Sequence, residues 1–156
     1  MEYKNKYDVL VVGGGHAGCE AAYSAATLGS RVLLISQNLE TIARMSCNPA
    51  MGGIAKGQIL REIDALGGMS AIVTDRSTIQ FRMLNKSKGP AMWSPRAQCD
   101  RKLFEKEWRL ALEGNKNIDF YQDSVERIII ENKRAVGVMT KMGVRIEGRA
   151  VVLCNG

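Results

Sequence analysis

The first 36 residues contain two short apolar runs, separated by a segment with small residues at helical spacing. The run at 7–12 (YDVLVV) is rich in β-branched residues, as expected for a strand covered on both faces in a parallel sheet. A second buried strand is predicted at 31–35 (RVLLI). Between them, residues 16–28 predict a helix that packs closely on the sheet through Gly18, Ala21, Ala22 and Ala25. Residues 1–36 therefore predict a βαβ unit.

The pattern changes after residue 36. Residues 37–57 have no sustained period and contain several glycines and a proline, which predicts a long loop, and loops of this length are usually functional. The helix predicted at 97–113 is strongly amphipathic, with a stripe formed by Phe104, Trp108, Ala111 and Leu112. The other predicted elements are a helix at 58–66 and strands at 79–84 and 117–122.

The last part of the chain predicts an antiparallel meander followed by one more buried strand. Residues 124–148 hold short apolar runs separated by ENKR and KMG, as in a β-meander insert. The run AVVL (150–153) then leads into a glycine turn, where a natural terminus rarely falls, so we expect a longer protein. The predicted fold class is α/β, with a parallel sheet and a small antiparallel meander, truncated before the rest of the protein.

Composition narrows the class of protein. A chain of 156 residues that is 46% hydrophobic and 24% charged can bury an ordinary core. Its apolar runs fall far short of the roughly 20 residues of a membrane span, and the N-terminus does not resemble a secretory signal. We expect no membrane partner and a cytoplasmic location. The four cysteines are far apart and there is one histidine, so no metal-ligand spacing can be assembled and we expect no metal.

The net charge of +6 is concentrated in residues 76–109, which hold nine basic residues against three acids. This excess has two interpretations, a solvated helix face or a surface that binds phosphates or nucleic acid. Few aromatic residues lie among these charges, so a stacking platform for single strands is not indicated.

A glycine motif follows the first predicted strand. Gly13, Gly15 and Gly18 fit G-x-G-x-x-G between a strand and a helix, the context that makes this motif specific for a dinucleotide. The first glycine allows a tight turn, the second lets a pyrophosphate approach the backbone, and the third lets the helix pack on the strand. The N–H groups at the helix N-terminus then face the phosphates. With Gly14, His16 and Ala17, these residues form the predicted phosphate loop, 13–18.

The ribose-binding acid that usually ends the second strand is missing. Ser36 and Gln37 stand there, and the nearest acid, Glu40, lies several residues further on. Ser36 or Gln37 is therefore a candidate ribose contact, and the sequence does not decide between them. We interpret His16 as a spacer in the loop and not as a catalyst, because it has no recognisable acid partner.

Several motifs occur in an order that resembles one family. They are DVLVVGGGHAGCEAA, SCNPAMGGIAKGQ, EIDALGG, IQFRMLNKSKGPA and PRAQCDR. In this order they resemble the N-terminal part of GidA/MnmG, the FAD-dependent tRNA wobble-uridine modification enzymes, and the resemblance runs through the whole chain. Two positions depart from the family pattern, since Met51 and Ala55 replace a more usual Ile and Gly.

The resemblance implies a Rossmann-like FAD-binding domain, with residues 13–18 around the pyrophosphate and the Val125 backbone at the adenine end. It also implies that the complete enzyme adds a carboxymethylaminomethyl-type group to carbon 5 of the wobble uridine in tRNA. NADH, a folate-derived one-carbon unit and an amine are consumed, a GTPase of the MnmE type is the partner, and a homodimer is expected. The NADH-binding and C-terminal helical domains lie outside this chain, so we expect this part alone to be inactive.

The resemblance also gives a role to Cys47, in the second glycine-rich segment. That segment is expected to bring backbone close to the flavin ring and to fix the thiol beside it. A thiolate there, near a helix N-terminus at 57–58, is a candidate nucleophile or relay in catalysis. An inert loop cysteine is the alternative, because no activating base is identifiable.

Other functions remain open at this point. One alternative is a folate- and FAD-dependent tRNA uridine methyltransferase, which shares the opening fold. A second alternative is a different flavoprotein with two dinucleotide sites, such as a disulfide reductase. A third is a non-catalytic FAD-binding module. A disulfide reductase is expected to carry C-x-x-C or C-x4-C after the second strand, and Cys47 has no such neighbour.

Overall fold

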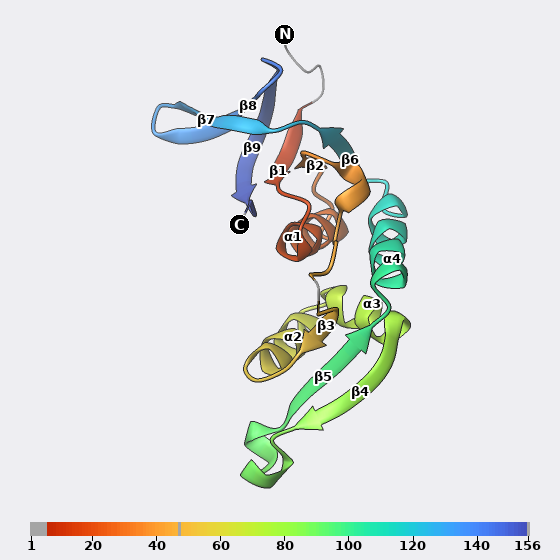
Figure 1. Cartoon of the computed structure of the whole chain (residues 1–156). Helices are drawn as coiled ribbons and strands as arrows, with labels where there is room; N and C mark the ends of the chain where they lie inside the picture. Colours follow the sequence, from red (N-terminus) through yellow and green to blue (C-terminus); the bar gives the residue numbers. More distant parts are fainter. Residues whose placement is uncertain (1–5, 47, 156) are drawn as a thin grey trace. The chain divides into compact units, whose positions relative to one another are not determined.

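The structure is a computed structural model that describes residues 6–46 and 48–155 (Figure 1). By the contacts among these residues, the chain divides into two compact units, and each is described by itself. The first unit comprises residues 1–43 and 111–156, and the second comprises residues 44–110.

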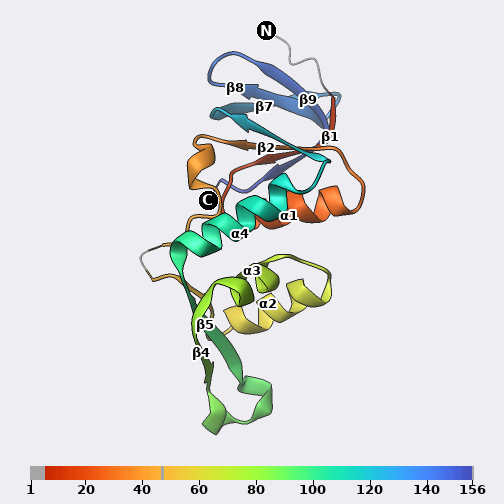
Figure 2. The same ribbon diagram turned by 90° about the vertical axis from the view of Figure 1, so that its right-hand side faces the viewer.

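The first unit is built on a mixed sheet with the strand order β6-β2-β1-β9-β8-β7. Strand β1 (Tyr7–Val12) lies between β2 (Val32–Ser36) and β9 (Arg145–Leu153), and it is parallel to both. Strand β6 (Ile118–Gln122) extends the parallel part beyond β2. The crossover from β1 to β2 runs through α1 (His16–Thr27), which lies against the sheet in Figures 1 and 2. The predicted parallel α/β fold with its βαβ unit is confirmed.

The antiparallel meander is continuous with the parallel sheet. Strand β7 (Val125–Glu131) pairs with β8 (Arg134–Thr140), and β8 pairs with the first residues of β9. From Gly148 onward, β9 pairs with β1 instead. The strand predicted at AVVL is thus the second half of β9, and a single strand joins the meander to the parallel sheet.

The core of the first unit is formed mainly by strands. One buried cluster consists of Tyr7, Leu10, Val12, Leu33, Ile35, Val138, Val144 and Ile146. Val11, Val32 and Leu34 of the same strands are also fully buried. Helix α1 contributes small buried residues, which are Gly18, Cys19, Ala22 and Ala26. The predicted contact face of this helix is therefore rotated slightly, since Ala21 and Ala25 are only half-buried. Close packing of the helix on the strands is confirmed.

The second unit combines a small antiparallel sheet with helices. Its strand order is β3-β5-β4, with β3 at Ala50–Gly52, β4 at Thr78–Leu84 and β5 at Ser94–Cys99. Helices α2 (Lys56–Ala65) and α3 (Ser70–Ser77) lie on one side of this sheet (Figure 2). The short 3-10 helices η2 (Lys86–Lys88) and η3 (Pro90–Met92) connect β4 to β5, and α4 (Arg101–Glu113) follows β5.

Two predictions for residues 37–113 were wrong in detail, and one helix was missed. The segment 37–57 contains η1 (Leu39–Thr41) and β3, and α3 was not predicted. The helix predicted from residue 97 begins at Arg101, because residues up to Cys99 pair in β5 and Asp100 caps the helix, with its Oδ1 accepting from Leu103 N (2.9 Å). The apolar stripe of α4 is confirmed for Phe104, Trp108 and Leu112, which are fully buried, whereas Ala111 is half-buried. Across the described ranges, no helix is both long and apolar enough to cross a membrane.

Candidate functional site

The turn between β1 and α1 depends on glycine at two positions. Gly13 has φ +111°, a conformation that favours glycine, and an added Cβ would overlap the carbonyl oxygen of Cys154. At Gly18, an added Cβ would overlap the carbonyl oxygen of Gly13, so helix and turn touch through backbone atoms. These two glycines therefore let the chain turn sharply and start a helix directly against the strand.

Gly15 differs from its neighbours because the space beside it is open. It is the N-cap of α1, has φ −74°, and an added Cβ would meet no atom within 4 Å. No side chain caps the helix at this residue, and the first turn contains no acid. The first turn of any helix has N–H groups without intrahelical acceptors, and they carry the positive end of the helix dipole. The turn can therefore accept an anionic group close to its backbone.

A cavity of about 610 Å³ opens beside this turn. Its lining includes Gly13–Gly15 and the carboxyl ends of β1, β2 and β9. The chain leaves β1 toward β2 and β6 on one side and returns to β9 on the other, so the strand order reverses at β1. Ligands of open α/β sheets bind at such a switch point, outside the carboxyl ends of the strands. The cavity lies within the 300–1,000 Å³ range typical of small-molecule sites.

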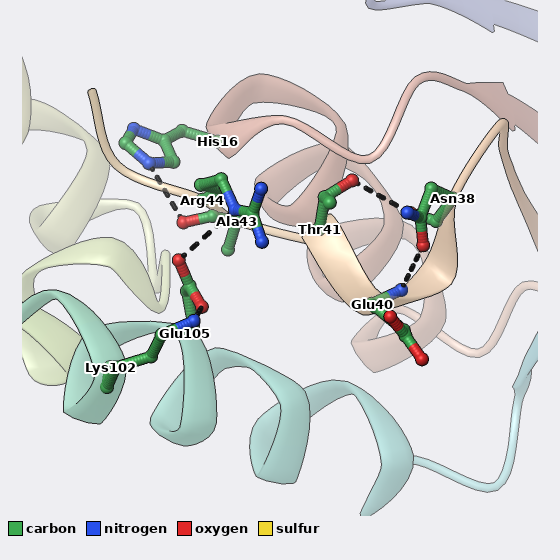
Figure 3. A network of polar contacts seen from close by, with 8 residues as sticks. All are labelled: His16, Asn38, Glu40, Thr41, Ala43, Arg44, Lys102 and Glu105. Atoms are coloured by element: carbon green, nitrogen blue, oxygen red, sulfur yellow. Dashed lines mark hydrogen bonds and ion pairs between the residues drawn. The ribbon is translucent and has the colours of Figure 1, made fainter. Parts of the chain in front are cut away.

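The structure brings most predicted site residues to this cavity. Its lining includes Gly13, Gly14, Gly15, Ser36, Gln37 and Val125. The other loop residues, His16, Ala17 and Gly18, lie in α1 behind the turn and are not part of the lining. The His16 ring donates from Nε2–H to the carbonyl oxygen of Ala43 (3.2 Å; Figure 3), which holds the chain that follows η1. This contact agrees with the interpretation of His16 as a structural residue.

The chain after β2 is ordered by Asn38, which the sequence analysis did not single out. Its Oδ1 accepts from the Glu40 amide (2.8 Å), and its carbonyl oxygen accepts from the Thr41 hydroxyl (3.0 Å; Figure 3). Asn38 and Thr41 line the cavity, whereas Glu40 does not. The acid nearest in sequence to the second strand is thus not placed to contact a ribose, and Ser36 and Gln37 remain the candidates there.

Asp123 is the main residue of the cavity wall that the sequence analysis missed. It follows β6 directly, and its amide donates to the Ser36 carbonyl oxygen (3.1 Å), which ties the ends of two parallel strands together. The hydroxyl of Thr140 and the amides of Ser124 and Met142 donate to its carboxylate and lower its pKa. The carboxylate thus stays ionised and braces the wall. An acid directly after a predicted parallel strand was the available signal.

A match to a family model identifies the family of this chain. The model of the family described as glucose inhibited division protein A (GidA) matches residues 8–156. The chain belongs to the GidA family.

Individual relatives agree with the family assignment. The chain is 62% identical over 154 residues to the tRNA uridine 5-carboxymethylaminomethyl modification enzyme MnmG of Flavobacterium psychrophilum, covering 99% of this chain and 25% of that protein. The corresponding MnmG of Flavobacterium johnsoniae is 64% identical, with the same coverage. The solved structure of Aquifex aeolicus GidA superposes with a TM-score of 0.94 at 47% identity, over 97% of this chain and 25% of that chain. This GidA-family chain thus spans about a quarter of the length of these relatives.

The second glycine-rich segment of this GidA-family chain leads into α2. Cys47 itself lies outside the described residues. Beyond it, Gly52, Gly53 and Ala55 all have positive φ, and the Gly53 amide donates to the Pro95 carbonyl oxygen (2.8 Å) while the Ser94 hydroxyl donates to that of Gly53. Ala55, at φ +66°, adopts a conformation that favours glycine. Helix α2 begins at Lys56, slightly earlier than predicted.

The other cysteines of this family member divide by burial. Cys19 and Cys99 are buried, and Cys154 is half-buried just after β9. Burial raises the pKa of the Cys19 thiol to about 12. It therefore stays protonated at neutral pH and cannot act as a nucleophile. Among the residues that the structure describes, no group of three or more His, Cys, Asp or Glu is arranged to hold a metal ion.

Proposed function

We propose that this chain is the N-terminal, FAD-binding part of an enzyme that modifies the wobble uridine of tRNA. The observation that carries the proposal is the open backbone at Gly15, at the start of α1 and at the switch point of a GidA-family sheet. This turn suits a pyrophosphate, because phosphate oxygens accept hydrogen bonds from the N–H groups at the start of a helix. Relatives that cover almost all of this chain bear the name of a tRNA uridine modification enzyme.

In this proposal the cavity beside the turn holds the adenosine diphosphate part of FAD. Gly13, Gly14 and Gly15 lie against the pyrophosphate, Ser36 or Gln37 contacts the ribose, and the Val125 backbone lies at the adenine end. FAD, when bound, supplies the two-electron chemistry of the reaction. Cys47 is the proposed nucleophile or relay of the modification.

The remaining parts of the proposal come from the family resemblance. The product is a carboxymethylaminomethyl-type group on carbon 5 of the wobble uridine. NADH and a folate-derived one-carbon unit are co-substrates, a GTPase of the MnmE type is the partner, and the complete enzyme is a homodimer. We expect the NADH site outside this chain, which spans about a quarter of the relatives' length.

Gly15→Val in the full-length protein tests the cofactor site. A Cβ at this position meets nothing within the protein, so the fold should survive, while the branched side chain should occupy the space of the pyrophosphate. Purified variant should contain less than about a tenth of the wild-type flavin, and tRNA from cells that carry only this variant should lack the modified nucleoside. Gly15→Ala is the matched control, with a smaller intrusion and a smaller loss. Stoichiometric flavin in the Val variant would overturn the assignment of the site.

A further inference from the structure

The hairpin formed by β4 and β5 carries positive charge without any acid. From Thr78 to Cys99 the sequence contains no Asp or Glu, and its basic residues are Arg82, Lys86, Lys88 and Arg96. A solvated surface usually mixes both signs of charge. A one-sign hairpin is instead typical of a surface that meets a polyanion.

Two of these charges lie directly opposite each other. Arg82 and Arg96 are cross-strand partners in the register of the hairpin, and Gln80 and Gln98 form the neighbouring pair on the same face. The Cβ atoms of directly opposed residues lie about 4.5–5.5 Å apart, and like charges at such positions destabilise a sheet. The folded hairpin therefore tolerates repulsion at this pair.

The repulsion is not relieved by an acid within the described part of the chain. No described carboxylate forms an ion pair with Arg82 or Arg96. Other basic residues of the same unit are neutralised locally, since Arg76 pairs with Glu107 (3.2 Å) and Lys102 pairs with Glu105 (3.0 Å; Figure 3).

At Arg96 and Gln98, the polar face of the hairpin lies opposite the face that packs on α3. Nearer the tip, Ser94 on the same side as Arg96 is buried, and its hydroxyl donates to Gln58 of α2 (3.4 Å). Residues alternate along β5, so Ala97 and Cys99 point to one side and Arg96 and Gln98 to the other. Ala97 and Cys99 are buried, and the Cys99 thiol lies 4.0 Å from the carbonyl oxygen of Thr74 in α3. Arg96 and Gln98 are half-buried, and Arg82 on the neighbouring strand is exposed.

The tip of the hairpin holds two further cations in a fixed turn. Lys86 and Lys88 are exposed and lie in η2, which follows Asn85 in the left-handed conformation (φ +58°). The indole N–H of Trp93 donates to the Lys86 carbonyl oxygen (3.2 Å), and the Lys88 amide donates to that of Asn85 (3.0 Å). These bonds order the lysine backbone, so less conformational entropy is lost when the tip binds a ligand.

We propose that this face of the β4–β5 hairpin binds the phosphate backbone of the RNA substrate. Arg82 and Arg96 share a phosphate or grip two adjacent ones, since guanidinium groups bind phosphates with paired hydrogen bonds. Lys86 and Lys88 add point charges at the tip. Such contacts hold and orient RNA without selecting its sequence. This inference rests on the proposed function, because it takes tRNA as the polyanion.

The test is the double variant Arg82→Gln/Arg96→Gln in the full-length, FAD-loaded protein, with a purified tRNA transcript as the probe. Loss of one or two phosphate contacts should weaken binding about 5- to 20-fold at 0.15 M salt and reduce the slope of log affinity against log salt by about 0.7–1.8. The matched control is Lys133→Gln/Arg134→Gln, which removes the same charge from the exposed β7–β8 turn. It should change affinity less than about twofold.

The thermal stability of the RNA-free protein distinguishes RNA binding from a structural role, in which the two arginines pair with acids elsewhere. If the arginines face RNA, removing their mutual repulsion should leave the melting temperature unchanged or raise it. A lower melting temperature with unchanged tRNA affinity would overturn the inference, because the arginines would then pair with acids elsewhere in the complete protein or its second copy. An unchanged salt slope would also overturn it while leaving the proposed function intact. If the wild-type protein does not bind tRNA, both proposals fail.

Discussion

Replacing Gly18 with alanine should destabilise the first unit, although alanine is the better helix former. Gly18 lies in the first turn of α1, where an added Cβ would overlap the carbonyl oxygen of Gly13. The obstacle is backbone and not the end of a flexible side chain, so helix and turn must move apart. Movement of α1 would loosen its buried contact with the sheet, which includes Cys19, Ala22 and Ala26.

Two opposing contributions set the change in free energy of unfolding caused by Gly18→Ala. Helix propensity favours alanine over glycine by about 1 kcal/mol. Overpacking costs about 1–3 kcal/mol, and we take the upper end at Gly18 because backbone cannot repack. The net loss in free energy of unfolding is therefore about 2 kcal/mol. Gly15→Ala is the matched control, since its Cβ meets nothing and only the weaker N-cap preference of alanine is lost, at below about 1 kcal/mol.

Amide hydrogen exchange of the FAD-free, full-length protein, followed by mass spectrometry, measures this loss locally even if the complete protein unfolds in several steps. A loss of 2 kcal/mol corresponds to about 30-fold faster exchange of the most protected amides in β1 and α1 of the Gly18→Ala variant. Gly15→Ala should exchange less than about fivefold faster. If the Gly18→Ala variant exchanges at the wild-type rate or more slowly, the overlap with Gly13 does not determine this turn.

Four further outcomes are expected. Cys47→Ser should keep FAD content and tRNA affinity while wobble-uridine modification, measured as nucleoside in tRNA, falls about a hundredfold or more, and normal modification would contradict a catalytic role. Burial raises the pKa of Cys19, so iodoacetamide at pH 8 should label Cys154 and spare Cys19. The contribution of Cys19 to stability should be full below pH 9 and be lost as pH rises toward 12, a decline absent from a Cys19→Ala variant. Lys133→Gly should slow exchange in β7 and β8 about fivefold, because Asn132 and Lys133 both have positive φ, and faster exchange would contradict this turn geometry.

The parts of the fold that the sequence predicted correctly are those fixed by neighbouring residues. The apolar runs at 7–12 and 31–35 became β1 and β2 within a residue of the expected bounds. The glycine spacing at 13–18 was predictive because each glycine answers a separate local demand, positive φ at Gly13 and close contact at Gly18. The amphipathic period of α4 likewise identified its buried stripe.

The missed features depend on pairing between distant residues. Strand β3 is only three residues long and exists through its pairing with β5, about 45 residues away. Helix α3 contains the β-branched run Ile72-Val73-Thr74, which lowers helix propensity, and tertiary packing overrides it. Asp123 joined the cavity because β6 pairs with β2, a register that no local pattern reveals.

The basic segment shows most clearly what folding adds to a charge count. By sequence alone, the nine cations of residues 76–109 are equivalent, and a solvated face explains them as well as a phosphate-binding surface does. The fold separates them, because α3 and α4 bring Arg76 to Glu107, whereas the hairpin register brings Arg82 to Arg96. A paired cation contributes little to the binding of a polyanion, since the RNA would have to displace its acid. Two opposed arginines with no acid partner among the described residues gain from the same encounter, because a bound phosphate offsets the repulsion between them.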